Sequence, residues 1–226
     1  MKEFAYQDAY ELIHQELILP YVPSDAQAIL EEYEKECKAH LNRYVKQRDD
    51  DDLQKWISGN EIQKEKAVSE LLKKNLREYE IEVQTLLDSD LLDEFKGELI
   101  EALIEQRVDS SYKIMKDGLE VTFIPSAIVP IHEDDTLIQT REIFSEWFSN
   151  DNPAFYNFCC RLLEQEALES RPFDFEDVSP LSLAKSIVRL VMEAFGQSEE
   201  FLAFMKIKGM TEIVEYPLSI ERRGEE

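Results

Sequence analysis

Apolar residues recur at intervals of three and four along the middle of the chain, which is the spacing of one face of an α-helix. A first stripe predicts one long helix and runs through Val68, Leu72, Leu76, Tyr79, Val83 and Leu86. A second stripe follows the polar break at Asp88–Asp90 and includes Leu92, Phe95, Leu99 and Leu103. Two long amphipathic helices joined by a short turn pack as an antiparallel hairpin. One continuous helix is the alternative interpretation, and it would expose more apolar surface.

The N-terminal part of the chain has the same helical character. Amphipathic spacing predicts a first helix over Phe4–Ile18 and a second over Ser24–Val45. The four acidic residues of Asp49–Asp52 predict a solvated turn that caps a short helical piece. The Gly59-Asn60 pair then predicts a break in the chain.

After Gly118 the pattern changes to a period of two. Leu119, Val121 and Phe123 alternate with polar residues, which predicts a strand. A weaker strand signal covers Thr211–Tyr216. We expect these two strands to pair as a small ribbon.

Proline and glycine divide the C-terminal part into helices. Asn152-Pro153 and Ser179-Pro180 each place a capping residue before a proline at the first helical position, and Gly196 is the expected C-cap of a helix. The predicted helices are Thr136–Ser149, Pro153–Leu168, Leu183–Phe195 and a short one from Ser198.

These patterns together predict a mainly α fold, a multi-helix bundle with a long antiparallel helical hairpin and one small β-element. The length of 226 residues suits one large domain or two small ones. We expect a single helical domain over residues 1–226. A candidate boundary near residue 117 would separate N-terminal helices (1–117) from a helical part with the β-ribbon (118–226).

Charge narrows the classes of partner. The chain has 49 acidic and 25 basic residues, a formal net charge of −24. Nucleic acids and anionic membranes require a basic face, and no Lys/Arg cluster here stands clear of acids, so we expect no direct nucleic-acid or membrane binding. An acidic surface favours a basic protein partner, a metal cation or solubility alone.

Cysteine content and hydropathy indicate the compartment. The N-terminal segment has acids inside every apolar stretch and does not resemble a signal peptide, and no apolar run approaches the length of a membrane helix. The three cysteines, Cys37, Cys159 and Cys160, form no disulfide or metal-finger pattern. We therefore expect a cytoplasmic protein.

Clustered glutamates are the candidate metal ligands. Carboxylates three residues apart on a helix reach the same face and can hold a divalent cation. The best-placed group is Glu98, Glu101 and Glu105, although Glu-x-x-Glu pairs are no more frequent than chance predicts for this glutamate content. With six glycines and no phosphate-binding loop or nucleophile motif, the sequence favours a protein without cofactor, catalytic residues or enzymatic activity.

Aromatic residues provide the candidate partner-binding site. Phe144, Trp147 and Phe148 share one helical face, and Tyr156 lies in the next helix. Aromatic side chains anchor many protein interfaces, whereas core packing is the commoner role of such a face.

The function that these features favour is an acidic, non-enzymatic protein-binding module: an adaptor, inhibitor, immunity protein or dedicated chaperone for a basic or apolar protein partner. Its acidic surface would steer the partner, which would then dock in an apolar groove. Mimicry of nucleic acid is a variant of this hypothesis. The alternatives are a metal-dependent all-helical phosphohydrolase using clustered glutamates and a structural subunit of a larger assembly.

Overall fold

The computed structural model describes residues 2–19 and 21–222, with side chains for 5–19, 21–42 and 49–222. Within this part the protein is mainly α-helical, with one two-stranded antiparallel sheet, as the sequence predicts. The chain forms two compact units, Met1–Gly59 and Asn60–Glu226. The candidate boundary near residue 117 therefore falls inside the second unit.

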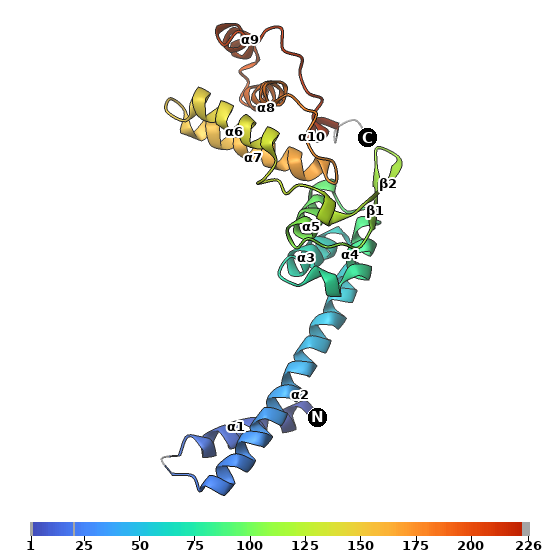
Figure 1. Cartoon of the computed structure of the whole chain (residues 1–226), viewed down its shortest axis with the longest axis vertical. Helices are drawn as coiled ribbons and strands as arrows, with labels where there is room; N and C mark the ends of the chain where they lie inside the picture. Colours follow the sequence, from blue (N-terminus) through green and yellow to red (C-terminus); the bar gives the residue numbers. More distant parts are fainter. Residues whose placement is uncertain (1, 20, 223–226) are drawn as a thin grey trace. The chain divides into compact units, whose positions relative to one another are not determined.

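The first unit is a helical hairpin. Helix α1 (Lys2–Leu17) lies antiparallel to the N-terminal part of α2 (Ser24–Ile57), as Figure 1 shows in blue. The second helix was expected to end near Val45, and the prediction of a turn at Asp49–Asp52 is wrong because those residues are helical. An ion pair of 2.9 Å from Lys55 to Asp52, three residues apart, shows how the helix accommodates acids near its C-terminal end.

The chain breaks after Ser58, as the Gly59-Asn60 signal predicts. Asn60 caps α3 (Glu61–Leu71) by accepting from the backbone N–H of Gln63, and the Gln63 side chain accepts from the backbone N–H of Asn60. This reciprocal capping box begins the second unit.

The long helix predicted over Val68–Leu86 is divided. It consists of α3, a 3-10 turn η1 (Leu76–Glu78) and α4 (Glu80–Leu87), and α5 (Asp93–Glu105) follows after a break. The side chain of Gln106 explains the first division: it donates to the Lys74 carbonyl and accepts from the Leu76 N–H. A residue some thirty positions away thus bonds the backbone groups that the helix interruption frees.

The sheet contains the predicted strand with a different partner. Strand β2 (Leu119–Phe123) pairs with β1 (Tyr112–Lys116), and Ile114 lies opposite Val121. The expected pairing with Thr211–Tyr216 is wrong, because that segment is not a strand. Asp117 and Gly118 both have positive φ, 48° and 77°, which is the backbone of a two-residue hairpin turn. Because the Asp-Gly turn joins β1 directly to β2, pairing with β1 requires a much shorter loop than pairing with Thr211–Tyr216.

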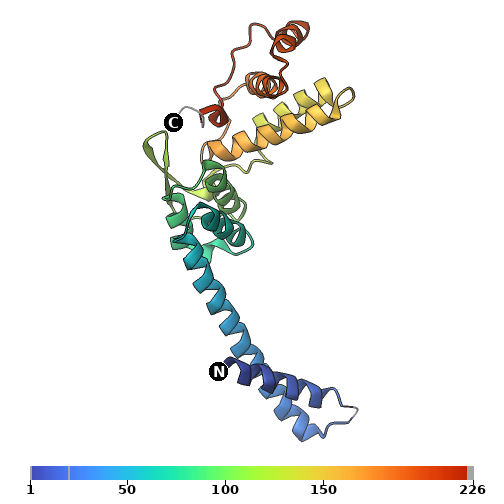
Figure 2. The ribbon, with the colours of Figure 1, turned by 180° about the vertical axis from the view of Figure 1, so that it is seen from behind.

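The remaining helices follow their proline and glycine signals. After the 3-10 turn η2 (Pro125–Ala127) come α6 (Asp135–Phe148), α7 (Pro153–Ser170), α8 (Pro180–Ala194), α9 (Ser198–Ile207) and α10 (Ser219–Arg222). Gly196 ends α8 with a φ of 72°, as its predicted capping role requires. The buried side chains of α6, α7, α8 and α9 form one apolar core. Figure 2 shows α6 and α7 side by side from the reverse direction.

Candidate functional site

The predicted aromatic site lies largely inside the core. Phe144 and Phe148 are buried, and Phe148 stacks on Phe204 of α9 with 5.2 Å between ring centroids. Trp147 is half-buried and meets the same ring edge-on at 5.5 Å, and Tyr156 packs partly buried against the core. The aromatic face therefore packs α6, α7 and α9 against one another. Most of it belongs to the core and does not form an exposed interface.

An open groove lies instead between α5, α7 and the end of α8. Its volume is about 640 Å³. Apolar side chains make up most of its wall, and charged side chains complete the lining. The lining residues are Glu94, Glu98, Phe158, Arg161, Leu162, Glu164, Gln165, Leu168, Leu190, Val191, Ala194 and Phe195.

Two phenylalanines dominate the apolar wall. Phe158 is 48% exposed and Phe195 is 53% exposed, and their rings meet edge-on with centroids 5.3 Å apart. Phe158 faces outward because Cys159 and Leu163, four residues apart, form the buried stripe of α7. Phe195 is set at the end of α8 by the turn at Gly196. Large exposed rings that line one groove are unusual on a protein surface and mark sites of association.

The groove depends on a close approach of α5 to α7. Gly97 faces the backbone of α7, and a Cβ at this position would lie 2.0 Å from the Leu168 carbonyl oxygen. Only glycine fits such a contact, so residue 97 sets the spacing of the two helices that form the groove.

Three of the four charged side chains that line the groove are acidic. Glu94 and Glu98 stand four residues apart on α5, Glu164 is exposed on α7, and Arg161 is the basic residue among the lining side chains. Burial, together with the negative charge of Glu94, raises the pKa of Glu98. A cationic group entering the groove would relieve both effects, since it would offset the desolvation and the repulsion between the carboxylates.

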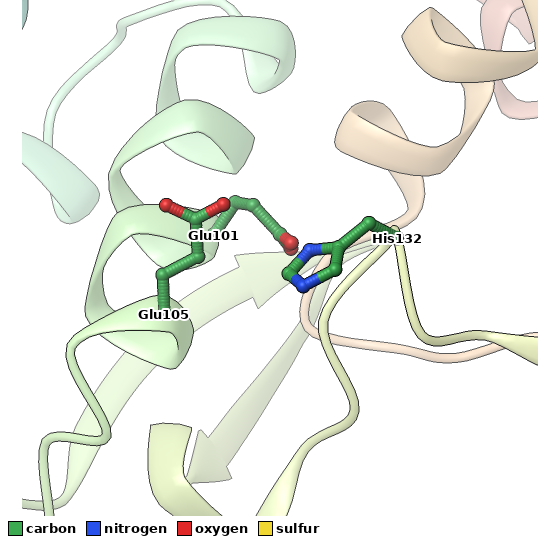
Figure 3. A group of neighbouring side chains, drawn as sticks. All are labelled: Glu101, Glu105 and His132. Atoms are coloured by element: carbon green, nitrogen blue, oxygen red, sulfur yellow. The ribbon is translucent and has the colours of Figure 1, made fainter.

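The predicted metal ligands are only partly brought together. Glu101 and Glu105 approach His132, which lies in the loop before α6, and one ligand atom from each lies within 4.8 Å of the others (Figure 3). Glu98 lies in the groove and not in this cluster. His132 was missed because no spacing relates a loop histidine to a helix some thirty residues earlier.

Glu101 already has partners inside the protein. Its Oε2 lies 2.5 Å from Nη2 of Arg171, and its Oε1 accepts from the Ile131 N–H at 2.7 Å. Arg171 is 2% exposed and also donates to the Val129 carbonyl. A cation bound to Glu101 would compete with this buried guanidinium, so the cluster is better suited to anchoring the loop at residues 129–131 than to holding a metal.

The adjacent cysteines Cys159 and Cys160 are not poised for nucleophilic chemistry. Burial raises the pKa values of Cys159 and Cys160, and the adjacent Cys160 raises that of Cys159 further. Both therefore hold a proton at neutral pH, whereas the nucleophilic form of cysteine is the thiolate.

Comparison of the chain with protein-family models, with curated proteins and with solved structures found no match. Among the described residues, none of the helices combines the length and the apolar character needed to cross a bilayer.

Proposed function

We propose that this protein is a protein-binding module whose groove between α5, α7 and α8 takes a basic, amphipathic segment of a partner protein. The observation that carries the proposal is the combination of apolar and acidic side chains in the lining of one groove. The apolar wall would bury the partner's hydrophobic side chains, and the acids would pair with its lysines or arginines.

The apolar contact supplies most of the expected affinity. Phe158 and Phe195 are half-exposed and already in contact with each other, so a bound side chain would cover both rings without rearranging the core. Aromatic side chains at the centre of an interface commonly contribute more than about 1 kcal/mol each, and a loss of about 1.4 kcal/mol raises the Kd tenfold.

The acidic side chains would orient the partner and raise its rate of association. The net charge of −24 attracts a basic partner at long range, and Glu94 and Glu98 give the attraction a local target. Such steering raises the association rate and is weakened by salt.

A designed peptide tests this proposal. The probe is a leucine–lysine peptide of about five helical turns, with leucines at helical spacing, and its counterpart replaces lysine with glutamate. We expect the basic peptide to bind the full chain and to slow backbone hydrogen exchange in residues 158–168, and we expect the acidic peptide to do neither.

A matched pair of variants locates the site. Phe158→Ala should raise the Kd at the groove about tenfold. Phe173→Ala removes a ring that is equally exposed, at 51%, and does not line the groove, so it should leave the Kd unchanged. Equal effects of the two substitutions, or equal binding of both peptides, would contradict the proposal.

A further inference from the structure

The N-terminal hairpin has little buried core of its own. Among the described side chains between residues 5 and 42, Cys37 is the only buried one. Helices in water are held mainly by the packing of their apolar faces, and isolated short helices are marginal. The hairpin therefore has apolar surface that a further element would be expected to cover.

One side of the hairpin is closed by polar contacts. Glu34 pairs with His14 at 3.3 Å and with Lys38 at 3.1 Å, and the Lys38 ammonium lies 5.5 Å from the centre of the Tyr10 ring. Tyr10 in turn stacks on His14. These charged and aromatic groups satisfy one another at the seam between α1 and α2.

The other side is open and apolar. A groove of about 290 Å³ runs between the helices there, lined by Ala5, Tyr6, Ala9, Ile13, Tyr33, Glu36 and Cys37. Leu12 follows Ala5 and Ala9 at helical spacing and is 64% exposed, and Ile29 precedes Tyr33 by four residues and is 54% exposed. We call the surface formed by Ala5, Ala9, Leu12, Ile13, Ile29 and Tyr33 the open face.

The open face has a pattern of small and large side chains on which another helix could pack. Ala5 and Ala9 lie one turn apart and leave space between the larger side chains of Tyr6, Ile13 and Tyr33. Small residues allow the backbone of another helix to approach, and flanking larger residues pack into its grooves. A helix placed here would convert the hairpin into a three-helix bundle with a central core.

Charge determines which helix fits. Residues 5–42 include eight acidic and two basic residues. Glu16 and Glu36 extend the open face at helical spacing from Leu12 and Tyr33, whereas Lys38 is paired on the closed side and Lys35 lies about 200° around the helix from Tyr33. A second copy of this chain would place acids against acids, so the complementary occupant is a basic helix.

We infer that the open face of the N-terminal hairpin is a second docking surface, which takes a basic amphipathic helix of a partner protein as the third helix of a bundle. This surface lies in the first compact unit, and the groove of the proposed function lies in the second, so either site can fail without the other. Engagement of both by one partner would add avidity to two moderate affinities.

The test uses the full chain, the leucine–lysine peptide and a peptide of the same composition with scrambled order. Hydrogen exchange is read separately in residues 5–42 and 158–168. We expect fast exchange of residues 5–42 in the free protein, and strong protection on adding the helical peptide but not the scrambled one. Phe158→Ala should leave this protection intact.

Two substitutions that add the same negative charge distinguish an effect of filling the groove from an effect of electrostatics. Ala9→Glu places a longer charged side chain in the groove, and Gln15→Glu adds the same charge at an exposed position that does not line the groove. We expect the Ala9→Glu variant to need at least ten times more peptide than the wild type for the same protection of residues 5–42. Gln15→Glu should leave this concentration unchanged. If circular dichroism shows that Ala9→Glu loses helix, Ala9→Met fills the groove without charge and should weaken binding in the same way.

Two results would overturn the inference. One is peptide protection confined to residues 158–168, which would leave the proposed function standing and remove the second site. The other is a free protein with residues 5–42 already protected and a solution mass twice the chain's 26.5 kDa, which would make a second copy the occupant.

Discussion

Glu98 differs from most of the acidic residues because burial and the neighbouring charge of Glu94 raise its pKa. The folded state then binds this proton more tightly than the unfolded state does, so the ionised side chain destabilises the fold above its raised pKa. This contribution to stability falls as pH rises from the ordinary value of 4.5 through the folded-state pKa.

Glu98→Gln should therefore stabilise the protein at pH 7 and lose that advantage as the pH falls towards 4.5. Thermal unfolding across this range measures the effect, and Glu142→Gln on the exposed surface of α6 is the control that should change little. A variant that is less stable than the wild type at pH 7 would show that Glu98 already has a stabilising cationic partner.

Arg171 and Glu101 form the other informative pair of residues. Removing one member of a buried ion pair leaves its partner uncompensated, so Arg171→Ala should lower the free energy of unfolding by about 3–5 kcal/mol. Urea denaturation measures this loss. His132 is exposed, and His132→Ala should change stability by no more than about 0.5 kcal/mol.

The same pair decides the metal hypothesis. Because Arg171 lies against Glu101, we expect titration with Zn²⁺ or Mn²⁺ to show no tight binding that depends on His132. Micromolar binding that His132→Ala abolishes, together with metal-dependent phosphatase activity, would instead support the phosphohydrolase alternative.

At the scale of elements, the position of α5 against α7 depends on one residue. Gly97→Ala would place a methyl group on the Leu168 carbonyl, so the helices would have to separate. Such overpacking costs about 1–3 kcal/mol, and it should also weaken peptide binding because α5 and α7 both line the groove. Thermal unfolding and the peptide Kd check both effects, and an unchanged melting temperature would contradict the close approach.

Local signals in the sequence predict most elements, and contacts between distant residues account for the rest. The proline-led starts of α7 and α8 and the glycine end of α8 are local, and they were predicted from neighbouring residues. The division of the long stripe depends on Gln106, whose amide bonds the freed backbone groups from a distance. No periodicity before residue 76 contains that information.

The groove could be predicted only in part. Phe158 stands beside the stripe of Cys159 and Leu163, and Phe195 directly precedes a glycine cap, so their exposure has a signal in the sequence. That both rings meet beside α5 is a consequence of helix packing. The Glu-x-x-Glu motif of Glu166 and Glu169 is buried, and its role is structural. Glu166 accepts hydrogen bonds from the backbone N–H groups of Ser219 and Ile220.

At the scale of the whole molecule, both candidate docking surfaces have acidic surroundings. The groove of the second unit and the open face of the first both combine exposed apolar side chains with acidic neighbours. We expect the net charge of −24 to attract the same class of partner to both surfaces and to disfavour self-association through either. A basic protein with an amphipathic helix is the partner that we propose for this combination.

The most direct test of the groove is the salt dependence of peptide binding. Binding is measured there by the hydrogen exchange of residues 158–168. Salt is raised from about 50 mM to about 500 mM for the wild type and for the double variant Glu94→Gln, Glu98→Gln. We predict that wild-type affinity falls steeply with salt and that the double variant binds more weakly and with a shallower dependence. Affinity that ignores salt, or an identical slope in the two proteins, would contradict the account.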